Sequence, residues 1–304
     1  MFNNILFASS MIVINDNNET NTYYYNCSDN ITNDTIIIDI AKPIKKVSLN
    51  IFNIFSIESK KIIINNAKEK IKSELLKGRV IEANQNYDSN DDIADIIVFS
   101  IPNEVNTSFL STTTFEVLGS VNEFIFTNPN GIIIKGIKFN GIGKLTLTTG
   151  TYNDDFRINN IGTIKNIYGK LSMLPAENED HLAIDASEVS ELNLLAREIE
   201  ILGETIVKGP LVITTGICNK KQLISNIIKP KYSINSSLFG NIQAGSVRFT
   251  SLEPNTDISI VNTSIISTID KIDINIREGN LFLLHGKLIS EQSNLSITAT
   301  SISL

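Results

Sequence analysis

Two apolar strands joined by a tight turn are predicted by the stretch Phe124-Ile125-Phe126-Thr127-Asn128-Pro129-Asn130-Gly131-Ile132-Ile133-Ile134. Proline fixes φ and lacks an N–H, asparagine tolerates left-handed dihedral angles, and glycine adopts a positive φ without a steric penalty. Pro129 at the second position and Gly131 at the fourth fit a type I turn. These four residue types by themselves indicate a turn and carry no functional signal.

The composition of the 304-residue chain indicates an all-β protein. Apolar residues make up 42% and charged residues 19% of the chain, which excludes a wholly disordered protein. Abundant isoleucine and threonine favour strands, while asparagine and glycine favour turns. The formal net charge of −7 gives no reason to expect a nucleic acid as partner.

Few side chains suit metal or nucleophilic chemistry. Cys27 and Cys218 lie far apart and outside any CxxC pair, so either one long-range disulfide or two buried thiols is expected. The chain has only two histidines, His181 and His285, which leaves few candidate residues for a zinc cage or a Ser-His-Asp site. We therefore expect no cofactor and no metal, and no segment reaches the roughly 18 apolar residues of a membrane span.

Similar strands recur at spacings that favour a solenoid. Residues 145–150 (LTLTTG) and 211–216 (LVITTG) are near-copies, and further short apolar strands follow as far as residue 300. Leu192 precedes Leu211 by 19 positions, and Val247 precedes Ile272 by 25. Spacings of about 20 to 25 residues are typical of successive β-helix coils. A β-sandwich remains an alternative.

Three stretches allow more than one interpretation. Residues 5–14 are either the remnant of a signal peptide or a first strand, within a polar cap segment predicted over residues 1–35. Residues 47–57 form a strand pair or one bent strand. Residues 67–78 are predicted to be a short amphipathic helix, inside a basic segment (residues 60–79) that is either a solvated face or a polyanion-binding patch.

Ordered sequence blocks resemble one known family over most of the chain. The blocks are residues 38–43, 47–55 with Asn50, 63–66 with Asn65 and Asn66, 117–119, 124–132, 141–150, 192–197, 211–216, and 232–240 with 244–245. Together they resemble the two-partner secretion domain at the N-terminus of filamentous haemagglutinins and contact-dependent inhibition exoproteins. The domain would span residues 36–304.

The resemblance implies a fold, a partner and a location. It implies a right-handed parallel β-helix with an N-terminal cap and a few extra antiparallel strands. It also implies that an outer-membrane two-partner transporter exports the chain, through its periplasmic POTRA domains, to the surface of a Gram-negative bacterium. The resemblance places the secretion motif on Asn128, Pro129, Asn130, Gly131 and Ile132. These residues act either as a structural corner or as a signal that the transporter reads.

Departures from the family pattern cast doubt on export of this copy. A second family motif, NPNL, falls on Asn84-Gln85-Asn86-Tyr87, where proline and leucine are both replaced. The chain also stops in a strand pattern, which predicts a continuation or a truncated gene.

Two other functions remain alternatives. One is an adhesin that binds glycans or receptors through the basic segment. The other is a β-helix enzyme acting on polysaccharides, with Glu177, Glu179 or Asp180 as acid and base beside His181. An ordinary solvated polar loop is the preferred explanation of these residues.

Overall fold

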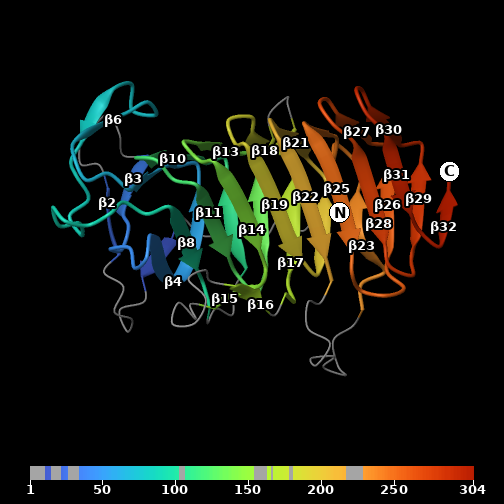
Figure 1. The fold of residues 1–304 in the computed structure, drawn as a ribbon, viewed down its shortest axis with the longest axis horizontal. Helices are drawn as coiled ribbons and strands as arrows, with labels where there is room; N and C mark the ends of the chain where they lie inside the picture. Colours follow the sequence, from blue (N-terminus) through green and yellow to red (C-terminus); the bar gives the residue numbers. More distant parts are fainter. Residues whose placement is uncertain are drawn as a thin grey trace.

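Each coil of the chain contributes one strand to each of three parallel sheets, and the coils stack into a right-handed β-helix (Figure 1). This computed structural model describes residues 11–14, 22–26, 34–102, 107–153, 163–165, 167–177, 181–216 and 229–304. Within those residues the regular elements are all strands. The predicted all-β solenoid is confirmed, and the sandwich alternative is wrong.

The three sheets are named here the first, second and third faces. The first face runs through β4 (Val47–Glu58), β8 (Ile96–Ser100), β11 (Glu123–Thr127), β14 (Lys144–Thr148), β19 (Glu191–Ala196), β22 (Pro210–Thr215), β25 (Ser246–Ser251), β28 (Ile272–Ile276) and β31 (Leu295–Thr298). The second runs from the end of β4 through β9 (Ser108–Ser111), β12 (Ile132–Lys135), β17 (Lys170–Leu174), β20 (Glu198–Ile201), β23 (Tyr232–Ser236), β26 (Asp257–Val261), β29 (Asn280–Leu284) and β32 (Ser301–Ser303). The third runs through β3 (Thr35–Asp39), β5 (Lys61–Asn65), β10 (Thr114–Leu118), β13 (Ile137–Asn140), β18 (Leu182–Ala186), β21 (Glu204–Val207), β24 (Ile242–Ala244), β27 (Ser264–Ser267) and β30 (Lys287–Ser290).

Strand register confirms the spacings seen in the sequence. Leu145 pairs with Leu192, which pairs with Leu211, so the two near-copies lie on one face with a single strand between them. Val247 pairs with Ile272 in the same way. β4 is one bent strand, because its start pairs with β8 on the first face and its end pairs with β9 on the second.

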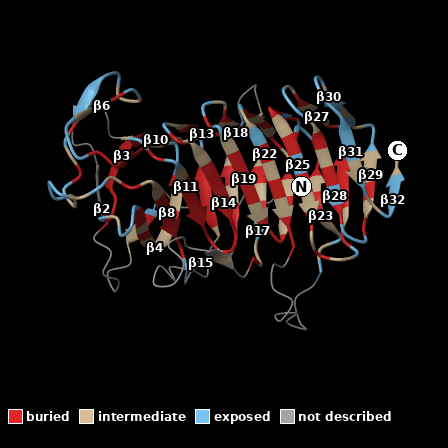
Figure 2. Cartoon of the chain, in the orientation of Figure 1, coloured by how far each residue is buried: buried red, intermediate tan, exposed pale blue. Residues whose placement is uncertain are grey.

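The core is a continuous apolar column inside the coils, red in Figure 2. Phenylalanines fill its N-terminal part: the ring of Phe99 lies 4.9 Å from that of Phe52 and 5.0 Å from that of Phe124. Leucine and isoleucine replace them further along, as at Leu192 and Leu211. Each fully buried side chain of this kind contributes about 1.5–3 kcal/mol, so stacking identical positions stabilises every coil against its neighbours.

Antiparallel pairings accompany the parallel coils. β1 (Met11–Ile14) pairs with β4 and β2 (Tyr23–Asn26) with β3. The hairpins β6–β7 (Ile71–Ser73 and Arg79–Ile81) and β15–β16 (Thr151–Asn153 and Thr163–Lys165) lie outside the coils. The cap boundary at residue 35 stays a prediction. Residues 1–10, Cys27 and Cys218 lie outside the described residues.

The prediction of a helix over residues 67–78 is wrong, because a hairpin occupies this stretch. Its apolar side chains, including Ile71 and Leu75, pack on a small cluster outside the third face. Buried Glu116 accepts hydrogen bonds from the Ser73 hydroxyl at 2.5 Å and the Glu74 N–H at 2.8 Å. The apolar spacing was compatible with a helix, but a carboxylate from a distant strand holds the chain in a turn.

Candidate functional site

The Asn128 turn joins β11 to β12 at the corner between the first and second faces. The Gly131 N–H donates to the Asn128 carbonyl at 3.1 Å, which closes the expected four-residue turn. Inside it, the Asn130 N–H donates to Asn128 Oδ1 at 2.9 Å. Gly131 has a φ of +123°, a conformation that other residues rarely adopt.

Asn128 connects its own coil to both neighbours. Its side chain is fully buried, and Nδ2 donates to Ser108 Oγ at 2.9 Å in the preceding coil. Its N–H donates to the Thr148 carbonyl at 3.1 Å in the following coil. Pro129 is half-buried and Asn130 is exposed. The two asparagines of the turn therefore do different things: the first holds coils together and the second faces solvent.

Gly169 is a further residue of this corner that the sequence did not reveal. A Cβ at this position would lie 2.6 Å from the Pro129 carbonyl oxygen and 3.0 Å from the Gly131 nitrogen. Its carbonyl accepts a hydrogen bond from Thr149 Oγ1 at 3.1 Å. Only a glycine lets the next coil lie directly on the Asn128 turn, and an isolated glycine before a strand gives no signal of such a contact.

The Asn84 turn repeats this geometry although its sequence has diverged. The Asn86 N–H donates to Asn84 Oδ1 at 2.9 Å, and the Tyr87 N–H donates to the Asn84 carbonyl at 3.2 Å. Asn84 is buried like Asn128. Replacing proline by Gln85 and leucine by Tyr87 has left both turn hydrogen bonds in place.

Amide side chains tie the Asn84 turn to the third face. Asn84 Nδ2 donates to the carbonyls of Ile40 at 3.0 Å and Asn65 at 2.8 Å, just where β3 and β5 end. Asn65 Nδ2 in turn donates to Asp39 Oδ1 at 2.7 Å. Burial raises the pKa of the Asp39 carboxyl, because the charged form loses its hydration. The turn thus fixes two neighbouring strand ends at once.

Tyr87 adds a contact that a leucine could not make. Its hydroxyl donates to Asn66 Oδ1 at 2.6 Å. Asn66 is itself buried, and its Nδ2 donates to the carbonyls of Ala94 at 2.9 Å and Ser120 at 3.0 Å. Burial raises the pKa of the Tyr87 phenol, so the group stays protonated and remains a donor.

Asn50 occupies a similar bridging position between strands. Its Oδ1 accepts hydrogen bonds from the Ala41 N–H and Thr22 Oγ1, both at 2.9 Å. Its Nδ2 donates to the Val98 carbonyl at 3.2 Å. The structure therefore places the predicted asparagines in two separate corners rather than in one pocket, and most of them are buried connectors between backbone segments.

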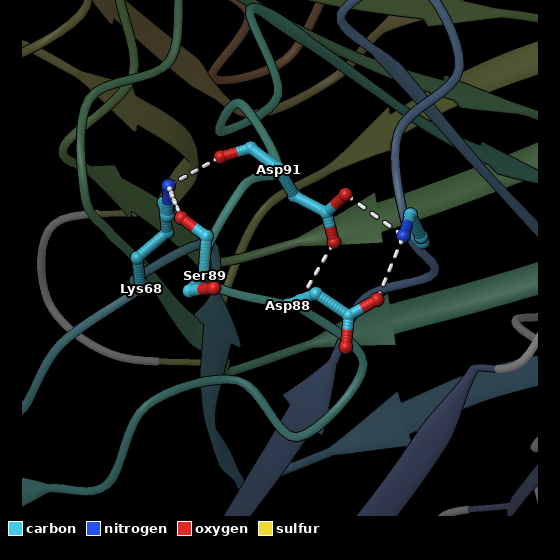
Figure 3. Close-up of polar contacts among 5 residues, drawn as sticks. Lys68, Asp88, Ser89 and Asp91 are labelled. Carbon is cyan, nitrogen blue, oxygen red and sulfur yellow. Dashed lines mark hydrogen bonds and ion pairs between the residues drawn. The ribbon is translucent and has the colours of Figure 1, made fainter.

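The loop after the Asn84 turn is fixed by two lysines. Figure 3 shows Lys68 reaching the backbone carbonyls of Ser89 and Asp91, the former at 3.0 Å. Lys42 forms ion pairs with Asp88 at 3.0 Å and Asp91 at 2.8 Å. The pair with Asp88 is exposed on both sides and adds little stability.

The basic segment (residues 60–79) and the polar loop that begins near Glu177 lie in different surroundings. Lys72 and Lys77 project from the exposed side of the β6–β7 hairpin, whereas Lys70 is paired with Glu82 at 2.8 Å. Glu177 is paired with Lys135 at 2.7 Å, which lowers the pKa of that carboxyl. The His181 ring stacks on Phe239 at 3.7 Å, while Glu179 and Asp180 lie outside the described residues.

The described residues contain no cluster of three or more His, Cys, Asp or Glu side chains able to hold a metal ion. Nor do they include a helix with the length and apolar character needed to cross a membrane.

Known proteins resemble the chain in both sequence and fold. No family model matches it. It is 28% identical over 214 residues to the tRNA nuclease CdiA-2 of Burkholderia pseudomallei (strain 1026b), covering 68% of this chain and 6% of that protein. It is 26% identical over 296 residues to the tRNA nuclease CdiA of Escherichia coli (strain STEC_O31), covering 91% of this chain and 8% of that protein.

A solved structure extends the likeness to the whole fold. The secretion domain of filamentous hemagglutinin superposes with a TM-score of 0.68 at 17% identity, covering 96% of each chain. The present chain thus spans less than a tenth of the length of the two nucleases but nearly all of a solved secretion domain.

Proposed function

We infer that this chain, a two-partner secretion domain of the filamentous haemagglutinin and contact-dependent inhibition exoprotein family, directs a larger exoprotein across the outer membrane of a Gram-negative bacterium. The observation that carries this function is the match of the whole β-helix to a solved secretion domain, over 96% of both chains. The nuclease activities named for the relatives belong to proteins more than ten times longer than the shared region.

The route that we propose runs through the periplasm to a two-partner transporter. An extended segment of the unfolded chain pairs with a sheet edge of a POTRA domain, because β-augmentation needs only backbone hydrogen bonds. Outside the cell, the first folded coils then template the next ones, since solenoid stability comes from contacts between neighbours. Asn128 has a structural role once the chain folds, because its buried side chain joins the turn to the preceding coil.

Co-expression of the full chain with its cognate transporter tests the function. A signal peptide would be attached, and the chain assayed in the medium and periplasm of a Gram-negative host. We expect the chain in the medium only when the transporter is intact, and in the periplasm when the POTRA domains are deleted. If the chain stays in the periplasm while a relative's secretion domain is exported by the same transporter, the proposed function is wrong.

Tyr87 offers a test of whether the diverged Asn84 turn still stabilises the domain. Tyr87→Phe removes the hydrogen bond to Asn66 Oδ1, which keeps its second donor, the Ala94 N–H. We expect a loss of about 1 kcal/mol in the free energy of unfolding, measured by urea denaturation. Tyr87→Leu restores the family residue but loses both the bond and the ring packing, so it should be at least as destabilising. A Leu variant more stable than the parent would identify Tyr87 as a damaging change.

Binding of glycans or receptors through the basic segment stays a prediction. The exposure of Lys72 and Lys77 on the β6–β7 hairpin is compatible with it.

A further inference from the structure

A row of outward isoleucines crosses the third face in its four most C-terminal strands. The register places Ile206 of β21 beside Gln243 of β24, which is followed by Ile266 of β27 and Ile289 of β30. The side chains next to them in β21, β24 and β27 are buried, so the residues of the row point away from the core. Ile289 is 41% exposed, while Ile206 and Ile266 are half-buried. These four residues are named here the isoleucine row.

A similar pair of isoleucines near the other end of the third face is covered. Ile37 of β3 pairs with Ile63 of β5, and both are buried because the β6–β7 hairpin packs on the cluster to which they belong. Figure 1 shows β6 at the opposite end of the molecule from β27 and β30. The outer side of this face therefore already serves as a contact surface in one place, where a second layer of chain excludes water from it.

Four charged side chains flank the isoleucine row, and their signs are reversed between its two ends. Glu204 and Lys208 lie on either side of the row at β21, whereas Lys287 and Glu291 lie on either side of it at β30. The backbone ladder continues through Lys208 and Glu291, whose N–H groups donate to carbonyls of the preceding strand at 3.3 and 2.9 Å. Strand alternation therefore directs all four side chains outward. Within the part of the chain that the structure describes, none of the four is in an ion pair.

We propose that the isoleucine row joins two copies of this chain in a symmetric dimer. A two-fold axis parallel to the strands places Glu204 opposite the partner's Lys287, and Lys208 opposite the partner's Glu291. Each contact occurs twice, so four ion pairs surround an apolar centre in which Ile206 lies on the partner's Ile289. Two carboxylates and two cations from each copy are all matched in this arrangement. The association does not depend on the role in export.

The two solenoids lie antiparallel in this dimer. A two-fold axis along the solenoid would also match charges, since Glu204 would then face the partner's Lys208. That axis would set the N-terminal coils of the two copies side by side, with both β6–β7 hairpins between their third faces. The antiparallel arrangement keeps each hairpin away from the contact, because only the strands of the isoleucine row overlap.

Further carboxylates near the row do not disturb this match. Asp185 lies beside Ile206 in register and is paired with Lys138 at 3.2 Å. Asp270 lines the outer side of the first face, around a corner of the coil from the row. Glu188 lies at a corner of the coil before β21, outside the four overlapping strands. The charge at the contact is therefore set by the four flanking side chains.

Sedimentation velocity of the full chain over a series of concentrations tests the proposal. Because the row spans only four strands, about 15–20 Å, we expect a weak and reversible dimer. The measured mass should approach twice that of one chain as the concentration rises. Added salt should raise the dissociation constant, since it screens the ion pairs at the rim. A chain that stays monomeric at submillimolar concentration contradicts the proposal.

A charge swap distinguishes contact between copies from contact within one copy. Glu204→Lys and Lys287→Glu each place like charges opposite each other, so either change should raise the dissociation constant at least about tenfold. The double variant restores opposite charges across the interface and should dimerise like the parent. Glu204 and Lys287 lie three strand spacings apart, about 14 Å, so contact within one copy does not explain such a rescue. Failure of the rescue, or rescue of Glu204→Lys by Lys208→Glu instead, would overturn the antiparallel dimer.

Lys72→Glu is the matched charge control, because Lys72 is exposed on the β6–β7 hairpin and lies outside the row. Ile289→Ser should weaken dimerisation, whereas Ile44→Ser, at an isoleucine that is 65% exposed before β4, should leave it unchanged. Thermal melting verifies that each variant is folded. Equal effects of the row variants and their controls would refute the proposal. Loss of association on Ile302→Asp alone would assign the contact to the coil of β32, where Ile302 is 48% exposed.

Discussion

Asn128→Ala is expected to destabilise the domain by about 2–4 kcal/mol and to reduce its export. The change removes the bonds from Asn128 Nδ2 to Ser108 Oγ and from the Asn130 N–H to Asn128 Oδ1, both at 2.9 Å. Each buried polar group left without a partner costs about 1–3 kcal/mol. Because Asn128 links consecutive coils, the loss also affects the coils that stack on this corner. Urea denaturation of the purified domain measures the stability, and the transporter assay measures export.

Asn130→Ala is the matched control, since it changes the other asparagine of the same turn. Asn130 is exposed, and its backbone N–H and carbonyl supply the hydrogen bonds to Asn128 and Thr107. We expect a change in stability of about 0.5 kcal/mol or less, with export retained. Loss of export of Asn130→Ala at unchanged stability would support direct reading of the turn by the transporter. In that case Asn128→Ala would melt like the parent protein while its export stopped.

Local sequence signals predicted the coils and the Asn128 turn well. Alternating apolar residues define the strands, and the turn chemistry of Pro129 and Gly131 acts within four residues. The same signals failed for the β6–β7 hairpin, because its apolar spacing also fits a helix. Contact with Glu116, which lies 43 positions after Ser73, decides the conformation there. Such a contact is not visible in a local pattern.

The Asn84 turn shows a second limit of sequence motifs. Two of its four residues depart from the family pattern, yet the turn keeps both of its hydrogen bonds, from the Asn86 N–H to Asn84 Oδ1 and from the Tyr87 N–H to the Asn84 carbonyl. The side chains of the family's proline and leucine take no part in these bonds. The retained amides explain why the predicted secretion motif keeps its geometry here, and Tyr87 compensates through a partner, Asn66, that the motif does not include.

Glu253→Ala should be the most damaging single change, with an expected cost of about 3–5 kcal/mol. Arg197 Nε donates to Glu253 Oε2 at 3.0 Å, and its terminal nitrogen donates to Oε1 at 2.8 Å. Both side chains are more than nine-tenths buried. They follow β19 and β25, which are separated by the coil of β22, so the pair joins coils that are not adjacent. Removing one partner leaves a buried charge without its counter-ion.

A double-mutant cycle distinguishes the pair itself from the cost of an unpaired charge. The double variant Arg197→Met with Glu253→Met replaces both charges by apolar side chains. It should be much less destabilised than the sum of the single variants Arg197→Met and Glu253→Met. Glu82→Ala is the surface control: its pair with Lys70 is as short, at 2.8 Å, but both side chains are 67% exposed. That change should cost less than about 1 kcal/mol. Equal losses for Glu253→Ala and Glu82→Ala in urea denaturation would show that the buried pair does not hold these coils together.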